Sequence, residues 1–132
     1  MSNLSVIKKE LINLTTKSYS PYSKFKVSCI VLTQQGKYYD GVNVENASYG
    51  LTICAERNAI FQAVAKEGKN CKIVAVFIYT PTQIPSAPCG ACRQVINEFG
   101  NDAKIKSFCD TEEILDEKLS TLLPHDFGPH NL

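Results

Sequence analysis

The sequence predicts a three-layer α/β/α sandwich around a mixed sheet of about five strands, formed by a single domain over residues 1–132. Three observations support this prediction. Residues 3–17 have the apolar spacing of an amphipathic helix, residues 25–44 have the pattern of a β-hairpin, and strands alternate with helices after that hairpin. A chain of this length can bury roughly two-thirds of its unfolded surface, so its core needs no disulfides.

The N-terminal helix is predicted over residues 3–17, because four apolar side chains recur at helical spacing: Leu4, Ile7, Leu11 and Leu14. Pro21 disfavours helix at the residue before it and so ends this element. Residues 25–32 are then predicted to form a strand, and a short polar turn leads to its hairpin partner over residues 38–44.

A second helix is predicted over residues 54–67, ended by Gly68. Its interior is apolar almost all round, so it must be covered on more than one side. The sheet covers one side, and another subunit is a candidate for the other. Residues 72–79 are a continuous run of β-branched and aromatic residues, which predicts a central strand buried on both faces.

The C-terminal third supplies the remaining elements. A loop leads to a helix predicted over residues 89–99, and a strand is predicted over residues 104–109. Residues 112–124 are ambiguous between strand and helix, and we expect a short strand followed by a short helix.

Charge and composition argue against several partners. The formal net charge is +1, which gives no electrostatic footprint for nucleic acid or an anionic membrane. No apolar run reaches the roughly 18 residues of a membrane span, and the N-terminus lacks the apolar core of a signal peptide. We therefore expect a cytoplasmic protein, in which the six cysteines are more often free or metal-bound than disulfide-bonded.

Three cysteines are predicted to converge at the starts of two helices. Cys54 begins one helix, while the C-x-x-C spacing of Cys89 and Cys92 puts two sulfurs on one face of the next. The positive end of a helix dipole stabilises thiolate, and three thiolates suit zinc, whose fourth position then stays open for water. Glu56, two residues after Cys54, could take a proton from that water and return it to a substrate.

Arg57 is predicted to tune the charge of this site. Three thiolates and one Zn²⁺ sum formally to about −1, and a bound hydroxide makes that about −2, which would hold the pKa of the water too high. A guanidinium that donates to a thiolate sulfur would offset this negative charge.

Five motifs occur in one order along nearly the whole chain: PYSKFKV, GVNVENASYG, TICAERNAI, PCGACRQ and LLPHDFGP. Together they resemble the small, homotetrameric cytidine deaminases, zinc-dependent enzymes that act on free nucleosides. The resemblance implies a cytidine deaminase-like sandwich and hydrolytic deamination of cytidine, and of deoxycytidine, to the uracil nucleoside and ammonia in pyrimidine salvage. It also implies that zinc-bound hydroxide attacks C4 while Glu56 shuttles the protons.

The resemblance implies a role for each matched residue. Three would ligate one zinc ion per subunit: Cys54, Cys89 and Cys92. Six would contact the substrate or line its site: Phe25, Asn43, Glu45, Ala55, Tyr49 and Phe127. Asn43 and Glu45 would hydrogen-bond the ribose hydroxyls, and Phe25 would pack against the pyrimidine. Tyr49 would line a site shared between the subunits of a homotetramer, and Phe127 would reach a neighbouring subunit's pocket.

One segment departs from the family pattern. The family usually has small residues, often glycine and alanine, where this chain has Ser28 and Cys29. The departure bears on the packing of the local strand and leaves the chemistry unaffected.

Other interpretations of the cysteines stay open at this point. A C-x-x-C motif alone is typical of a redox pair at a helix start, which would leave Cys54 and Glu56 unexplained. A structural zinc site needs a fourth ligand, and the chain offers five candidates: Cys29, Cys71, Cys109, His125 and His130. We expect these cysteines to be core residues and these histidines to be solvated.

Related zinc deaminases define two further alternatives. One acts on another aminopyrimidine nucleoside, such as an antibiotic. The other edits nucleic acids, which requires a basic surface that a net charge of +1 hardly provides. The members that act on tRNA also typically have histidine in the position of Cys54.

Overall fold

The structure is a computed structural model that describes residues 3–132. The strands are β1 (Ser28–Thr33), β2 (Tyr38–Val42), β3 (Ile73–Tyr79), β4 (Lys104–Phe108) and β5 (Ile114–Lys118). The helices are α1 (Leu4–Thr15), α2 (Ala55–Glu67), α3 (Gly90–Gly100) and α4 (Leu119–Leu122). Two 3₁₀ turns lie at Tyr49–Leu51 and Pro129–Asn131.

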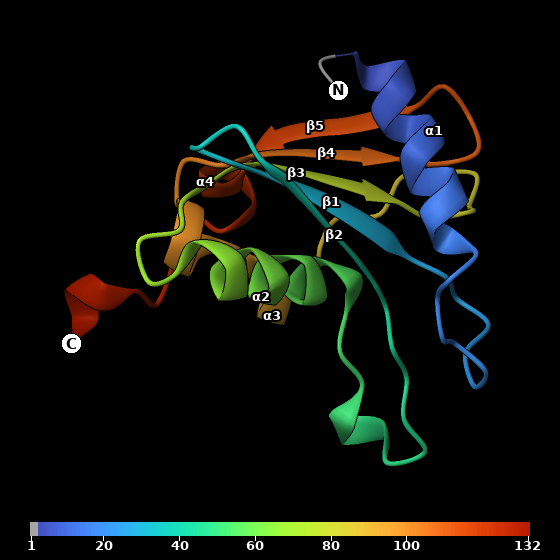
Figure 1. The fold of residues 1–132 in the computed structure, drawn as a ribbon, viewed down its shortest axis with the longest axis horizontal. Coiled ribbons are helices and arrows are strands. Elements are labelled where there is room, and N and C mark those ends of the chain that lie inside the picture. Colours follow the sequence, from blue (N-terminus) through green and yellow to red (C-terminus); the bar gives the residue numbers. More distant parts are fainter. Residues whose placement is uncertain (1–2) are drawn as a thin grey trace.

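The five strands form one mixed sheet in the order β2-β1-β3-β4-β5. Only β3 and β4 run parallel, and α3 lies in the connection between them, as a parallel pair requires. Figure 1 shows α1 on one face of the sheet and α2 with α3 on the other. The predicted three-layer sandwich with five strands is therefore confirmed, as are the short strand and short helix near the C-terminus.

One face of the sheet is covered by α1. Asn3 caps this helix, because its Oδ1 accepts a hydrogen bond of 2.8 Å from the backbone N–H of Ser5. The apolar stripe of α1 packs Ile7 and Leu11 against Ile30 and Phe77 on the sheet. These contacts form the smaller of the two cores.

The other face carries the larger core, between the sheet and the helices α2 and α3. Gly41 lets α2 approach β2 closely: a Cβ at this position would lie 2.5 Å from the backbone N of Ala59 and 2.7 Å from the carbonyl O of Ala55. Only a residue without a side chain fits there, so Gly41 fixes where α2 begins relative to β2.

The exposed edge of β2 is capped by two side chains from α2. Asn58 Nδ2 donates to the carbonyl of Val42 at 2.8 Å, and the backbone N–H of Asp40 donates to Gln62 Oε1 at 3.2 Å. Asn58 and Gln62 are four residues apart and so share a helix face. These side-chain amides satisfy backbone N–H and C=O groups of β2 that an uncovered edge strand would leave unpaired.

The strand predicted over residues 25–32 begins only at Ser28, so its first three residues were assigned wrongly. Asn43 explains the difference, because its side chain replaces the strand ladder there. Asn43 Nδ2 donates to the carbonyl of Phe25 at 2.7 Å, and the N–H of Val27 donates to Asn43 Oδ1 at 2.9 Å. The other predicted elements differ from the structure by one to two residues at their ends.

Ser28 and Cys29 are both accommodated in the sheet without any exposure. The hydroxyl of Ser28 donates to the carbonyl of Leu11 in α1 at 2.7 Å, which satisfies a buried polar group. Cys29 faces the opposite side and belongs to the core beneath α2. The departure from the family pattern therefore leaves the strand intact.

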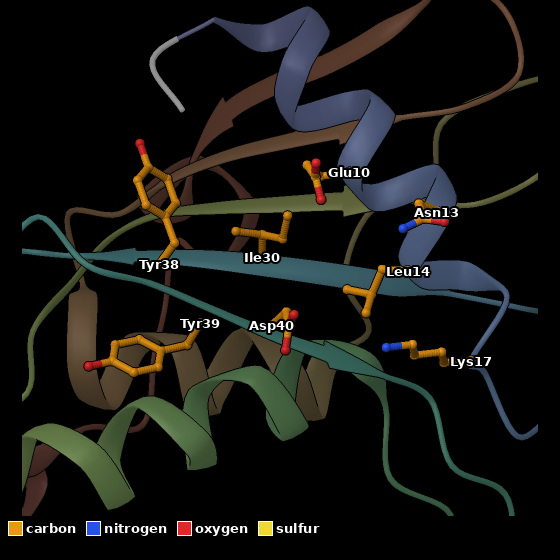
Figure 2. A pocket seen from close by; sticks show the side chains of 8 residues that line it. All are labelled: Glu10, Asn13, Leu14, Lys17, Ile30, Tyr38, Tyr39 and Asp40. Carbon is orange, nitrogen blue, oxygen red and sulfur yellow. The ribbon is translucent and has the colours of Figure 1, made fainter.

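A hollow of about 230 Å³ lies between α1 and β2. Figure 2 shows Glu10 on α1 and Lys17 just after its end, opposite Asp40 on β2, while Tyr39 points to the other face of the sheet. None of the predicted site residues lines this hollow. Within residues 3–132, no helix combines the length and the apolar character needed to cross a membrane.

Candidate functional site

Three cysteine sulfurs meet where two helices begin. Cys54 is the N-cap residue of α2, Cys89 is the N-cap residue of α3, and Cys92 lies in the first turn of α3. Their Sγ atoms all lie within 4.8 Å of one another, and Cys54 Sγ is 3.9 Å from Cys89 Sγ. Sulfurs in a tetrahedral zinc site, each about 2.3 Å from the metal, lie roughly 3.8 Å apart. The donor set and its spacing therefore fit zinc.

The loop before Cys89 is fixed by Arg93, the residue after Cys92. Arg93 Nε donates to the carbonyl of Pro88 at 2.7 Å, and Nη1 donates to the carbonyl of Leu122 at 2.8 Å. One side chain thus joins the chain just before one cysteine to the last residue of α4. This arrangement holds the two sulfurs of the C-x-x-C motif in place before any ligand binds.

The charge of the cluster is concentrated on Cys54. A hydrogen bond from Cys92, aided by Arg57, lowers the pKa of Cys54 to about 5, while burial opposes the shift. The same hydrogen bond and burial raise the pKa of Cys92, so this thiol keeps its proton when Cys54 has lost its own. The metal-free cluster therefore holds a thiolate at neutral pH, which is the form that binds a metal.

Glu56 is a buried carboxyl group in the first turn of α2, with only 5% of its surface exposed. Burial raises the pKa of Glu56, because the charged form loses its hydration. The negative charge of Cys54 acts in the same direction. A carboxyl group of this kind can hold a proton closer to neutral pH than an exposed glutamate can, as a general acid and base requires.

Arg57 donates from Nη2 to Cys54 Sγ at 3.3 Å. This contact raises the pKa of Arg57, so the guanidinium stays charged beside the thiolate. Its Nε is buried and has no hydrogen-bond partner among the described residues. Arg57 thus lies where its charge can act on the sulfur cluster.

The five candidates for a fourth ligand lie elsewhere. Three of them are buried free thiols: Cys29, Cys71 and Cys109. The two histidines, His125 and His130, are exposed near the C-terminus. Within residues 3–132, the metal-binding group contains three sulfur ligands and no fourth His, Cys, Asp or Glu. This favours an open site over a closed structural one.

The segment that carries Asn43 and Glu45 is tied directly to the start of α2. Val44 and Ile53 exchange two backbone hydrogen bonds of 3.0 Å, and Cys54 follows Ile53 in the chain. Glu45 therefore directly follows Val44, which pairs with the residue next to a metal-site cysteine.

A second hollow, of about 300 Å³, opens beside Glu45. It is lined by Tyr22, Ser23, Glu45, Tyr49 and Thr52. The rings of Tyr22 and Tyr49 lie 5.9 Å apart at a tilted angle. Tyr49 is 75% exposed, so the hollow is open on that side.

The remaining predicted residues have different surroundings. Phe25 is 43% exposed, and Asn43 is buried and bonded to the backbone on both sides of Lys26. Ala55 is fully buried in the core, so a contact with substrate would have to come from its backbone.

Phe127 is 63% exposed on a tail that lies along α3. Its backbone is held there by Gln94, which donates from Nε2 to the Phe127 carbonyl at 2.7 Å and accepts from its N–H at 3.2 Å. The structure does not bring the Phe127 side chain into the hollow beside Glu45.

Residues 1–108 match the family described as the cytidine and deoxycytidylate deaminase zinc-binding region. This chain belongs to that deaminase family. A cytidine deaminase of Halalkalibacterium halodurans is 42% identical over 125 residues, which cover 94% of this chain and 93% of the relative. A cytidine deaminase of Mycoplasma pneumoniae is 44% identical over 108 residues, which cover 81% and 79% of the two chains.

Solved structures of the deaminase family share the fold. The crystal structure of cytidine deaminase from Burkholderia pseudomallei superposes with a TM-score of 0.88 at 38% identity. The match covers 96% of this chain and all of the other. Together with the three sulfurs, membership of the family identifies zinc as the metal that this site holds.

Sequence reasoning missed three residues that hold this deaminase site together. Gly41 seats α2 on β2, Asn58 ties α2 to Val42, and Ser23 bonds to Glu45. Asn58 could have been found from its position four residues after Cys54, on the same helix face. No pattern in the sequence marks Ser23, because its partner lies 22 residues away.

Proposed function

We propose that this chain, as one domain over residues 1–132, catalyses the hydrolytic deamination of cytidine, and of deoxycytidine, to the uracil nucleoside and ammonia. The main support is one observation: three cysteine sulfurs meet at two helix starts, with the buried Glu56 carboxyl in the same turn as Cys54. A redox pair would need only Cys89 and Cys92, whereas here Cys54 completes a set of three.

Cys54, Cys89 and Cys92 are the residues that would hold the zinc ion. Zinc, when bound, lowers the pKa of a ligated water molecule to near 7 and so supplies the nucleophile for attack on C4. Arg57 donates to Cys54 Sγ and reduces the negative charge that the three thiolates place on the site.

Glu56 moves the protons of the reaction. One of its carboxylate oxygens would accept a proton from the attacking water and deliver it to N3 of the pyrimidine. The carboxylate would then accept the second proton from the oxygen now on C4 and deliver it to the 4-amino group, which leaves. The oxygen of water ends on C4, and the nitrogen departs as ammonia, so one water is consumed for each nucleoside. The raised pKa of Glu56 supports this role, because its carboxyl group must alternate between both states near neutral pH.

The nucleoside is held by the segments around the hollow beside Glu45. Asn43 and Glu45 would bind the ribose hydroxyls, and Phe25 would pack against the base. Tyr49 would line the site, and the backbone of Ala55 would contact the pyrimidine. Asn43 already makes hydrogen bonds to Phe25 and Val27, so the residue would contribute its remaining N–H.

We also propose a homotetramer with sites shared between subunits. Four side chains at the surface support such an assembly by their apolar exposure: Tyr49 (75%), Leu51 (64%), Phe127 (63%) and Phe61 (48%). Phe127 would reach a neighbouring subunit's pocket from the tail along α3. Light scattering should give the mass of four chains, and a stable, active monomer would contradict the assembly.

The six free thiols support a reducing compartment, and we propose that the enzyme acts in the cytoplasm in pyrimidine salvage. Fractionation of cells producing the protein checks the first part. Accumulation of cytidine in a strain that lacks the protein checks the second.

The ultraviolet absorbance of cytidine, incubated with the zinc-loaded protein, tests the activity. We expect the cytidine band to fall while one ammonia is released for each uridine formed. A folded, zinc-loaded protein that leaves both cytidine and deoxycytidine unchanged would contradict the proposal. It would direct attention to other aminopyrimidine nucleosides or to a structural role for the zinc.

A further inference from the structure

The turn between α1 and β1 is bonded to Glu45 more extensively than an exposed turn requires. Glu45 Oε1 accepts the backbone N–H groups of Tyr22 at 2.9 Å and Ser23 at 3.2 Å. Glu45 Oε2 accepts the hydroxyl of Ser23. One carboxylate therefore holds two consecutive residues of a turn that lies 22 positions earlier in the chain.

Ser23 also holds Phe25. Its Oγ accepts the backbone N–H of Phe25 at 3.0 Å while donating to Glu45. On the other side, the carbonyl of Phe25 accepts Asn43 Nδ2 at 2.7 Å. The carbonyl of Phe25 is thus bonded directly to Asn43. The N–H of Phe25 is connected to Glu45 through the hydroxyl of Ser23.

Lys24, between Ser23 and Phe25, has a strained backbone. Its φ is +61°, and it is the single residue other than glycine with positive φ in the described chain, residues 3–132. Such a conformation is unfavourable for a residue that has a side chain, so surrounding contacts must hold it. Glu45 accepts hydrogen bonds from Tyr22 and Ser23 just before Lys24, and the bond from the Phe25 N–H to Ser23 Oγ spans Lys24; together they provide this restraint.

We propose that Ser23 is a positioning residue that joins sugar recognition to base packing: its hydroxyl links the Glu45 carboxylate to the backbone of Phe25. The inference rests on the proposed function, in which Glu45 contacts the sugar and Phe25 contacts the base. Ser23 lines the hollow together with Glu45, so a nucleoside there meets one connected network. The same hydrogen bond from Ser23 keeps the pKa of Glu45 low, and the carboxylate stays charged for the sugar.

The KM and kcat of variants test this role. Ser23→Ala should raise KM for cytidine by about tenfold, as expected when a charge-assisted hydrogen bond is lost, and change kcat by less than about twofold, because Glu56 and the cysteines are untouched. Ser23→Thr keeps the hydroxyl and should restore KM. Lys24→Gly is the control for the backbone: it relieves the positive φ and keeps every hydrogen bond to Glu45. It also removes the Lys24 charge that helps to lower the pKa of Glu45, so KM should rise far less than in Ser23→Ala.

Double-mutant cycles separate positioning from a general loss of structure. If Ser23 acts through Phe25 and Glu45, Ser23→Ala should raise KM little further in a Phe25→Leu or Glu45→Gln background. Additive effects, an equal loss of kcat, or a failure of Ser23→Thr to restore KM would overturn the inference.

The same set of variants distinguishes the two levels of the proposal. If Glu45→Gln raises KM while Ser23→Ala does not, the positioning role is wrong and the proposed function stands. If Phe25→Leu and Glu45→Gln leave KM unchanged as well, the proposed substrate contacts fail together with the inference.

Discussion

The metal half and the proposed nucleoside half of the site are built in different ways. The metal half is Cys54, Glu56, Cys89 and Cys92; the proposed nucleoside half, called the nucleoside half below, is Phe25, Asn43, Glu45 and Tyr49. In the metal half, three sulfurs and Glu56 are placed by the first turns of α2 and α3, and Glu56 is 5% exposed. In the nucleoside half, Phe25 and Tyr49 are 43% and 75% exposed. Hydrogen bonds between segments about twenty residues apart hold that half together.

The difference shows where rigidity comes from in each half. A helix start fixes its own side chains through local geometry, while the packing of α2 and α3 on the sheet and the bonds from Arg93 bring the two helix starts together. The nucleoside half depends on a few side-chain bonds between loops, so single polar substitutions should loosen it. Gly41, Asn58 and the Val44–Ile53 bridge are the points that hold the halves together.

The largest expected effect separates metal binding from turnover within the metal half. Glu56→Gln should lower kcat by about 10²–10⁴-fold, as loss of a general acid and base does. Zinc content should stay at one ion per chain, because the three sulfurs remain. Metal analysis and steady-state kinetics on the same sample check both parts. Near-normal turnover would remove Glu56 from the mechanism.

Gly41→Ala disrupts the close packing of α2 against β2, which joins the two halves. Its Cβ would overlap the backbone of α2 at Ala55 and Ala59, so we expect a loss of about 1–3 kcal/mol in the free energy of unfolding and a lower zinc affinity. Gly50→Ala is the matched control, since a Cβ there meets no atom within 4 Å. Denaturant unfolding measures the stability of both variants. Equal free energies of unfolding for Gly41→Ala and Gly50→Ala would show that the close approach of α2 to β2 does not matter.

Arg57→Gln tests whether the Arg57 charge stabilises the Cys54 thiolate in the metal half. In metal-free protein the Cys54 thiolate forms as pH rises through about 5, and removing Arg57 should raise that pKa because its charge favours the thiolate. Thiolate absorbance during a pH titration measures the shift, with Cys54→Ala identifying the signal. An unshifted titration would exclude Arg57 from charge tuning.

The sign of the linked stability follows from the same pKa. Because the pKa of Cys54 is depressed in the folded state, its contribution to stability is fully present above the unfolded value of about 8.5. That contribution declines below this value and is lost as pH falls through about 5. In the Arg57→Gln variant the loss should begin at higher pH.

The smallest expected effect compares the two caps on β2. Asn58→Ala should cost about 0.5–1.5 kcal/mol of stability and raise KM, because Val42 precedes the nucleoside segment. Gln62→Ala removes the cap on Asp40, one turn further from Cys54, and should leave KM unchanged. Equal changes in KM for the two variants would mean that Asn58 has no special link to the nucleoside half.

The same division explains what the sequence could predict. The placement of Cys54, Cys89 and Cys92 at helix starts follows from spacing and helix geometry, which are local, and the alternation of strands and helices follows from hydrophobic pattern. The fold then brings Cys54 to Cys89, 35 residues later in the chain. The start of β1 was predicted three residues too early, because only the fold brings Asn43 to Phe25 and Val27. The links from Ser23 to Glu45 and from Asn58 to Val42 were missed for the same reason.

The central claim is that the three-cysteine site binds zinc for catalysis, and a zinc titration of metal-free protein tests it most directly. Cytidine deaminase activity should rise in proportion to added zinc and stop rising at one equivalent per chain, while Glu56→Gln binds the same amount and stays inactive. Zinc that binds and stabilises the fold without activity, or activity that does not depend on zinc, would contradict the account.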